Sequence, residues 1–353
     1  MKIRLAMLET DKLYLNRMVS VFNTKYADKL EIYSFTEKEN ALEALRKYHV
    51  DVFLAGEFFD IKKSELPDGC GFAWLVETSG IESLHGEAAL CKFQKAELIY
   101  KQILSIFSEQ ASAITGMHSG GSNAKLIGFF SAAGGSGSTM AAAACAVNLA
   151  QKGKKALYLN LETLGNTDLF FHGDGQGSFE DVIYAVKSRK GNLYLKMESS
   201  VRRDATGVYY FSKTTTALEM NELKAEELIR IITELKTSCD YEYVILDLDF
   251  SFAKEKLNIF AECSQLVMVS DGSIISNDKA LRILQALHIL EQQEDRRLTA
   301  RMGILYNRFI RTASKKLEGW DIPELGVIKH YEERKPEQLV QKLSQLSVFD
   351  NLL

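Results

Sequence analysis

The sequence has little proline, few cysteines and no long hydrophobic run. Three prolines and 23 glycines in 353 residues exclude a collagen-like or low-complexity architecture. The five cysteines are scattered and form no C-x-x-C pair, so we expect neither a disulfide framework nor a zinc cluster, and a reducing cytoplasm is favoured. No stretch of about 18 apolar residues is present, which excludes a membrane-spanning helix.

An excess of positive charge is also missing. The 43 Lys and Arg residues face 47 Asp and Glu residues, giving a net charge of −4, so no global basic field favours nucleic acid or anionic lipid. Charged residues interrupt the first apolar stretch at Arg4, Glu9 and Asp11, and we therefore expect no signal peptide. The remaining composition, 46% hydrophobic and 25% charged, is that of a globular chain with room for about two to three domains.

One stretch divides the chain into two parts. Residues 108–124 are rich in Ser, Gly and Ala and lack a sustained apolar stripe, which predicts a linker. We therefore expect one domain over residues 1–107 and a second over residues 125–353. Each is long enough to bury its own core.

The first part alternates between strand and helix patterns. Strands are expected at Ile3–Leu8, Leu30–Phe35 and Val50–Ala55, and helices at Leu13–Phe22, Ala41–Tyr48 and Ala96–Phe107. This alternation predicts a parallel sheet with helices on both faces.

This order of elements resembles a response-regulator receiver domain. A receiver has an acidic pair after its first strand, and this chain has Glu9 and Thr10 there. A lysine late in the receiver domain is matched by Lys92. The phosphoacceptor aspartate would fall at Gly56, or at Ala55 after a slip of one residue. Without an acceptor carboxylate, we expect a receiver-shaped interaction module that performs no acyl-phosphate chemistry.

A glycine loop opens the second part. A strand at Lys125–Ser131 is followed by AAGGSGSTM and then by a helix-forming run. Strand, glycine loop and helix together aim main-chain N–H groups and a helix N-terminus at a phosphate. A tight turn that binds nothing remains an alternative.

Two nucleotide-binding patterns compete for this loop. Gly135 and Gly137 fit the start of the dinucleotide fingerprint G-x-G-x-x-G/A, and Glu162 closes the next strand where a ribose-binding acid would lie, but Met140 takes the place of the third small residue. The P-loop of triphosphate-binding proteins requires Gly-Lys-Ser/Thr, and here Ser138 replaces the lysine.

The strands that follow end in polar residues. They are expected over 154–162, 241–249, 265–270, 301–307 and 326–328. The first ends at Glu162, the second delivers Asp247, and the fourth ends at Asn307. The stretch between Glu162 and Asp247 is expected to be rich in strands.

Taken together, these residues resemble the deviant P-loop ATPases of the ParA/MinD superfamily, over roughly residues 125–335. With a receiver-like domain in front, the whole chain is similar to the TadZ/CpaE family of polar-localisation ATPases of Tad (Flp) pilus assembly. The loop of the superfamily reads Lys-Gly-Gly-Val-Gly-Lys-Thr-Thr. Here both lysines are replaced, the first by Ala133 and the second by Ser138.

The resemblance implies an α/β fold class: a receiver-like (flavodoxin-like) parallel sheet, then a P-loop ATPase domain with a mostly parallel sheet flanked by helices. It implies ATP and Mg²⁺ as cofactors. Thr139 and Asp247 would hold the metal, and Glu162 would orient an attacking water. The residues implied in nucleotide binding are Ala133, Gly134, Gly135, Ser136, Gly137, Ser138, Thr139, Met140, Asn307 and Arg308.

The missing lysines affect hydrolysis more than binding. A lysine–phosphate contact is worth about 1.5–3 kcal/mol, or about 10- to 150-fold in affinity. Removing one stabiliser of the transferring phosphoryl group typically costs about 10²–10³ in rate. We therefore expect Mg-ATP binding with slow or absent hydrolysis. Candidates for a replacement cation are Arg202, Arg203, Lys213 and Lys279.

The resemblance also implies partners. It suggests a nucleotide-linked homodimer, contacts with pilus-assembly proteins, and recruitment of a cytoplasmic protein to the cell pole. The leucine spacing in the tail 337–353 predicts a packed terminal helix rather than a membrane anchor. The basic cluster in 307–316 is short, which disfavours DNA binding. An active partition-type ATPase that binds DNA, or an interaction module without nucleotide, remain alternatives.

Overall fold

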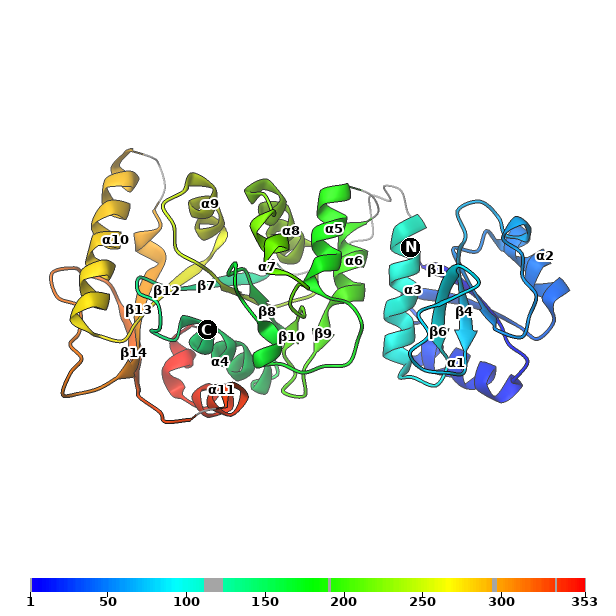
Figure 1. Ribbon diagram of the computed structural model, residues 1–353, viewed down its shortest axis with the longest axis horizontal. Coiled ribbons are helices and arrows are strands. Elements are labelled where there is room, and N and C mark those ends of the chain that lie inside the picture. The colour runs from blue at the N-terminus through cyan, green and yellow to red at the C-terminus, as the bar shows by residue number, and fades with distance from the viewer. Residues whose placement is uncertain (1, 111–122, 190–191, 294–296, 334, 353) are drawn as a thin grey trace. The chain divides into compact units, whose positions relative to one another are not determined.

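The computed structural model describes residues 2–110, 123–189, 192–293, 297–333 and 335–352 (Figure 1). The chain divides into two compact units. Unit 1 comprises Met1–Met117 and Ser188–Ser200, and unit 2 comprises His118–Lys187 and Val201–Leu353. The predicted linker falls mainly on residues 111–122, which lie outside the described residues. Both units are α/β with mostly parallel sheets, which confirms the predicted fold class.

Unit 1 contains a six-stranded sheet in the order β2-β1-β3-β4-β6-β5. Its strands are β1 (Ile3–Leu8), β2 (Leu30–Phe35), β3 (Val52–Gly56), β4 (Gly71–Val76), β5 (Ser83–Leu84) and β6 (Glu87–Cys91). All neighbours are parallel except β5 and β6, which form an antiparallel hairpin at the edge. With β6 as its fifth parallel strand, this is the flavodoxin-like order expected of a receiver-shaped domain.

Helices cover both faces of this sheet (Figure 1). The helices α1 (Lys12–Lys25) and α3 (Ala96–Gln110) lie on one face and α2 (Lys38–Tyr48) on the other. The helix α6 (Leu193–Ser200), which comes from far along the sequence, packs against α3. Sequence patterns predicted β1 to β3 and α1 to α3 to within a few residues, but they did not predict β4, β6 or the pairing of α6 with α3.

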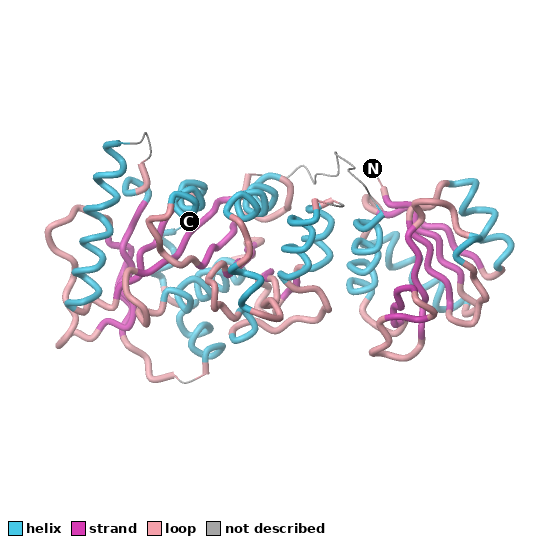
Figure 2. The backbone as a smooth tube through the Cα atoms, turned by 45° about the horizontal axis from the view of Figure 1, so that its top comes forward, coloured by secondary structure: helices cyan, strands magenta, loops and turns pink. Residues whose placement is uncertain are grey.

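Unit 2 contains an eight-stranded sheet in the order β14-β13-β12-β7-β11-β8-β10-β9, parallel except for β9. Its strands are β7 (Lys125–Ser131), β8 (Ala156–Asn160), β9 (Arg202–Arg203), β10 (Tyr209–Tyr210), β11 (Tyr243–Asp247), β12 (Gln265–Ser270), β13 (Met302–Phe309) and β14 (Glu324–Lys329). The central strands β7, β11 and β12 are apolar and buried almost throughout, as expected of a parallel sheet covered on both faces. Figure 2 shows these strands between two layers of helices.

One layer holds α4 (Ser138–Gln151) and α11 (Pro336–Ser344), and the other holds α8 (Ala225–Thr237), α9 (Lys254–Glu262) and α10 (Ile274–Gln293). The short helices α5 (Phe179–Ser188) and α7 (Ala217–Asn221) complete the unit. The predicted terminal helix is confirmed, since α11 buries Val340 and Leu343 in the same core as α4. In the described part of the chain, no helix has the length and apolar character needed to cross a membrane.

The prediction that the stretch between Glu162 and Asp247 is rich in strands is wrong. The structure forms α5 to α8 there, and only the two-residue strands β9 and β10. The apolar residues of α5 recur at helical spacing, with Phe179, Val182 and Val186 buried on one side. The helical period therefore outweighs the β-forming aromatic residues of this segment.

Candidate functional site

The loop between β7 and α4 lies at the carboxyl edge of the unit 2 sheet, where open α/β sheets bind ligands. Gly135 and Gly137 have φ angles of 84° and 83°, a left-handed backbone conformation that favours glycine. Gly134 and Ser136 do not have a positive φ. Such an alternation turns successive N–H groups toward one side. A Cβ at Gly134 or Gly135 would meet no atom within 4 Å.

The main-chain donors of this loop face few acceptors in the part of the chain that the structure describes. Among the described residues, the main-chain N–H groups of 134–137 make no hydrogen bond of standard geometry. The hydroxyl oxygens of Ser136 and Ser138 are also buried, and neither has a hydrogen-bond partner among the residues that the structure describes. A row of unused donors beside a helix N-terminus is suited to a phosphate group.

Two residues of β13 donate hydrogen bonds to the carbonyl oxygens of the loop. The Asn307 amide donates from Nδ2 to the carbonyl oxygens of Ser136 at 3.0 Å and Gly137 at 3.3 Å. The Arg308 guanidinium donates from Nη1 to the carbonyl of Gly135 at 2.8 Å. A Cβ at Gly137 would collide with the Asn307 amide. These bonds hold the loop carbonyls, so that its N–H groups stay available. Nucleotide binding by Asn307 and Arg308 stays a prediction.

Asp247, the last residue of β11, is completely buried beside the loop. Its Oδ2 accepts from the Tyr158 hydroxyl at 2.9 Å and from Asn160 Nδ2 at 3.3 Å. Its Oδ1 has no partner among the residues that the structure describes. Burial, followed by the negative charge of Glu162, raises the pKa of Asp247 well above its usual range. Such a carboxylate is ready to accept a cation.

Glu162 lies on the same side of the site. Its Oε2 accepts from the Thr139 hydroxyl at 3.2 Å, and its N–H donates to Asn160 Oδ1 at 2.9 Å. Burial raises the pKa of Glu162, and the charge of Asp249 adds to this effect. The structure therefore brings together Thr139, Glu162 and Asp247, three residues that sequence patterns selected from distant parts of the chain.

Two residues of this site were missed by sequence patterns. Tyr158 and Asn160 stand two apart on β8 and bond to the same oxygen of Asp247. Their spacing places both side chains on one face of the strand, and this signal was available in the sequence.

Within the described residues, no group of three or more His, Cys, Asp and Glu side chains is arranged to hold a metal ion. Thr139 and Asp247 therefore supply too few ligands for a metal site made of protein alone. Mg²⁺ is commonly held by one or two carboxylates together with water and substrate phosphates. The residues present fit an ion that arrives with a nucleotide.

The cations proposed to replace the P-loop lysines are scattered. Arg202 donates to the Gly177 carbonyl at 2.8 Å, and the Arg203 guanidinium lies 5.4 Å from the centre of the Tyr209 ring. Lys279 is exposed on α10. Lys213 differs, because it lines a small cavity together with Asn160 and Glu162.

This cavity measures about 20 Å³, which is too small for a nucleotide. A larger one of about 440 Å³, lined by Lys125, Gln265 and Met302 among others, lies at the amino ends of the strands. That edge is opposite to the loop. The open face of the glycine loop is consequently the candidate surface for a ligand.

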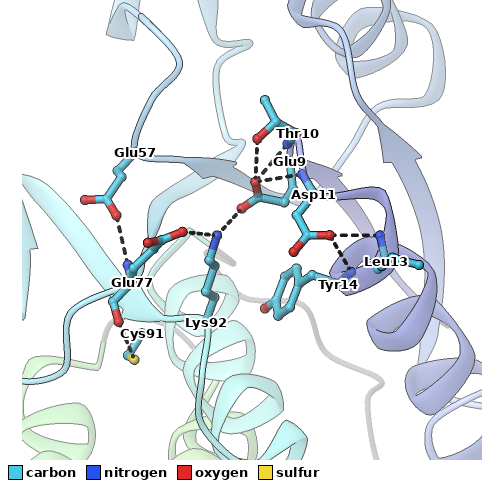
Figure 3. A network of polar contacts seen from close by, with 9 residues as sticks. All are labelled: Glu9, Thr10, Asp11, Leu13, Tyr14, Glu57, Glu77, Cys91 and Lys92. Carbon is cyan, nitrogen blue, oxygen red and sulfur yellow. Dashed lines mark hydrogen bonds and ion pairs between the residues drawn. The ribbon is translucent and has the colours of Figure 1, made fainter.

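The carboxyl edge of the unit 1 sheet carries the residues expected from a receiver (Figure 3). Lys92 Nζ lies 3.4 Å from Glu9 Oε2 and 2.7 Å from Glu77 Oε1, and the Lys92 side chain is only 4% exposed. Gly56 ends β3, and a Cβ there would lie 3.2 Å from Glu9 Oε2. The Glu9 carboxylate thus occupies the space beside the position where a receiver has its phosphoacceptor.

The first part of the chain matches one known family. Residues 1–108 match the family model described as "TadZ-like, receiver domain". No curated protein matches the sequence.

Solved structures are similar to the second part of the chain. A ParA family ATPase from Chlorobium tepidum TLS is 17% identical, with a TM-score of 0.47, over 63% of this chain and 99% of that one. MinD from Pyrococcus horikoshii OT3, complexed with Mg-ADP, is 18% identical with a TM-score of 0.47, over 63% and 94%. A variant of McdA from Cyanothece, in complex with ATP, is 15% identical with a TM-score of 0.48, over 66% and 97%.

Proposed function

We propose that this chain, whose residues 1–108 match a TadZ-like receiver domain, binds Mg-ATP in unit 2 and positions partner proteins in Tad pilus assembly. One observation carries the nucleotide part of this proposal. A row of unused main-chain donors lies beside a buried carboxylate, Asp247, that has an unpartnered oxygen among the described residues. Phosphate and a divalent cation would satisfy both at once.

Each residue of the site has a defined task in this proposal. The N–H groups of 134–137 and the N-terminus of α4 bind the phosphates, while Thr139 and Asp247 hold the ion. Mg²⁺ supplies positive charge against the phosphate oxygens when it is bound. Arg308, whose guanidinium donates to the Gly135 carbonyl, keeps the loop in shape and brings a positive charge near the phosphates, where Ser138 brings none.

Hydrolysis is slow or absent in this proposal. Glu162 is the carboxylate that would orient water, but burial raises its pKa and its Oε2 is bonded to Thr139. No lysine stands at Ala133 or Ser138 to stabilise the transferring phosphoryl group. The bound nucleotide would consequently remain a triphosphate, and the nucleotide-bound state would not be ended by hydrolysis.

The same edge of unit 2 carries exposed apolar side chains, which supports a homodimer linked by nucleotide. They follow β8, β11, β12 and β13, and are Leu164 (85% exposed), Phe252 (46%), Ile274 (81%), Ile275 (67%) and Ile310 (48%). Apolar side chains gathered at one edge mark an association surface. The basic cluster 307–316 does not favour DNA, because Lys316 pairs with Glu324 and Arg308 bonds to the loop.

Binding and turnover are tested with the full chain. Equilibrium dialysis with labelled ATP should give saturable binding in Mg²⁺, and Arg308→Ala should weaken it by about ten-fold. A phosphate-release assay on the same sample should detect little or no turnover. Brisk turnover would refute the scaffold proposal and favour an active partition-type ATPase.

Association is tested by light scattering after size exclusion, with Mg-ATP and with EDTA. Mg-ATP should raise the mass to that of a dimer, and Ile274→Ser should prevent this. Tyr184→Ser is a matched control, because Tyr184 is 70% exposed but lies on α5 rather than on this edge. A dimer that forms equally with Mg-ATP and with EDTA, or a loss of the dimer in the control variant, would contradict the proposed link between nucleotide and dimer.

The pilus role is supported by the match of residues 1–108 and needs a test in cells. A fluorescent fusion of the full chain, expressed in a bacterium that makes Tad pili, should form a focus at the cell pole. Asp247→Asn should disperse this focus if the nucleotide state governs recruitment. A wild-type signal spread evenly through the cytoplasm would contradict the positioning role.

A further inference from the structure

The carboxyl edge of the unit 1 sheet is tied together by one buried lysine. Lys92 follows β6 and pairs with Glu9, which follows β1, and with Glu77, which follows β4 (Figure 3). Glu57, after β3, accepts the N–H of Glu77 at 2.9 Å. Residues from the ends of four neighbouring strands are therefore held in one network.

This network carries a surplus of negative charge. Two carboxylates, on Glu9 and Glu77, pair with the single ammonium group of Lys92, and a third, on Glu57, accepts the N–H of Glu77, so the four side chains carry a formal charge of −2. The surplus reaches the surface, because the Glu77 side chain is 50% exposed while Glu9 and Lys92 are buried.

Large apolar side chains stand beside this charge. Leu13 is 82% exposed, Phe93 66% and Phe58 73%. The Tyr14 ring lies edge-to-face with Phe93, at 6.5 Å between centres, and the Lys92 ammonium lies 5.8 Å and 5.3 Å from these two rings. The lysine that holds the carboxylates thus also orients the aromatic pair.

We propose that this edge docks a segment of a partner protein that is both cationic and apolar. The acidic edge surface is defined by Leu13, Tyr14, Glu57, Glu77 and Phe93. Lysine or arginine side chains of the segment would pair with the surplus carboxylates, and its leucine or phenylalanine side chains would cover Leu13 and Phe93. Charge complementarity selects this occupant over an acidic peptide or an anionic membrane.

The acidic edge surface needs no modification to form. Gly56 offers no side chain to modify, and the Glu9 carboxylate beside it already pairs with Lys92. A surface held by internal ion pairs loses little freedom on binding, which favours affinity. This docking proposal does not depend on the nucleotide bound by unit 2, so either proposal can fail alone.

The test uses the full chain and a synthetic amphipathic peptide of leucine and lysine, about 18 residues long, with a fluorescent label. Fluorescence anisotropy at about 0.15 M salt measures its affinity. Phe93→Ser and Leu13→Ser should each weaken binding by about ten-fold, because each removes an exposed apolar anchor. Glu57→Gln, which keeps an acceptor for the Glu77 N–H, should weaken it by about two- to five-fold.

Two variants serve as matched controls. Ile289→Ser removes an apolar side chain that is 55% exposed on α10, and Glu43→Gln removes an exposed charge from α2. Both should leave the affinity unchanged, and circular dichroism should find every variant folded.

Three results would overturn the proposal. The first is an affinity that the edge variants do not change. The second is an equal loss of affinity in the controls. The third is a leucine–glutamate or serine–lysine peptide that binds as tightly as the leucine–lysine peptide.

Discussion

Replacing Asp247 by asparagine should separate stability from ligand binding. The substitution keeps the shape of the side chain and an oxygen to accept from Tyr158 and Asn160, but it removes the charge. Because burial and Glu162 disfavour that charge in the free protein, Asp247→Asn should change the free energy of unfolding by no more than about 1 kcal/mol. Binding of Mg-ATP, by contrast, should weaken by about 10- to 150-fold.

These values translate into a thermal shift that is easily measured. Mg-ATP at about 100 times its Kd stabilises the folded state by about 2.7 kcal/mol, which for a unit of this size raises Tm by about 5–11 °C. If the affinity falls about 100-fold, the same concentration of Mg-ATP stabilises the folded state by only about 0.4 kcal/mol and raises Tm by only about 1–2 °C. The wild type and Asp247→Asn should therefore differ clearly in scanning fluorimetry.

The pH dependence of this shift adds a second criterion. A carboxyl group whose pKa is raised by folding favours the folded state at low pH, and this contribution is lost as pH rises through the raised pKa. A proton also competes with the metal for Asp247. Mg-ATP affinity should thus rise with pH in the wild type and change less in Asp247→Asn.

Asp249→Asn is the matched control. It lies two residues further on, is exposed, and keeps an acceptor for the Thr163 N–H. Its Mg-ATP shift should be close to that of the wild type. An undiminished shift in Asp247→Asn, or a large loss of stability without ligand, would refute the role of Asp247 in binding.

Further predictions concern the loop and the buried lysine of unit 1. Gly137→Ala should destabilise the chain by about 1–3 kcal/mol in chemical denaturation, because φ is 83° and Asn307 is in the way, whereas Gly134→Ala should be tolerated. Ser138→Lys should raise phosphate release by about 10²-fold if the missing lysine limits hydrolysis, and an unchanged rate would place the limit elsewhere. Lys92→Met should lower the free energy of unfolding by about 3–5 kcal/mol, because it leaves the Glu9 and Glu77 carboxylates close together without a cation. A variant as stable as the wild type would contradict the network.

Much of the fold was predictable from local patterns. Alternating strand and helix signals gave the α/β class, and continuous apolar runs gave β7 and β12 to the residue and β11 with two extra residues at each end. The strand β4, GFAWLV, was missed although it is an apolar run bounded by turn residues. The packing of α6 on α3 could not be predicted, because it depends on tertiary contacts between segments about 90 residues apart.

The candidate site was predictable in its residues but not in its contacts. The resemblance to the superfamily, together with position at a strand end or in the glycine loop, pointed to Thr139, Glu162 and Asp247. The sequence could not indicate that Asn307 and Arg308 bond to the loop carbonyls, since that depends on how β13 and the loop approach each other. In unit 1, Lys92 was matched from its position, but its pairing with Glu77 follows only from the folded sheet.

The most direct measurement is a crystal structure of the full chain grown with Mg-ATP. We expect the triphosphate to lie against the N–H groups of 134–137, with the metal ion between a phosphate oxygen, Thr139 and Asp247. A glycine loop without ligand at millimolar Mg-ATP, or a nicotinamide dinucleotide bound there in preference, would contradict nucleotide binding by this loop.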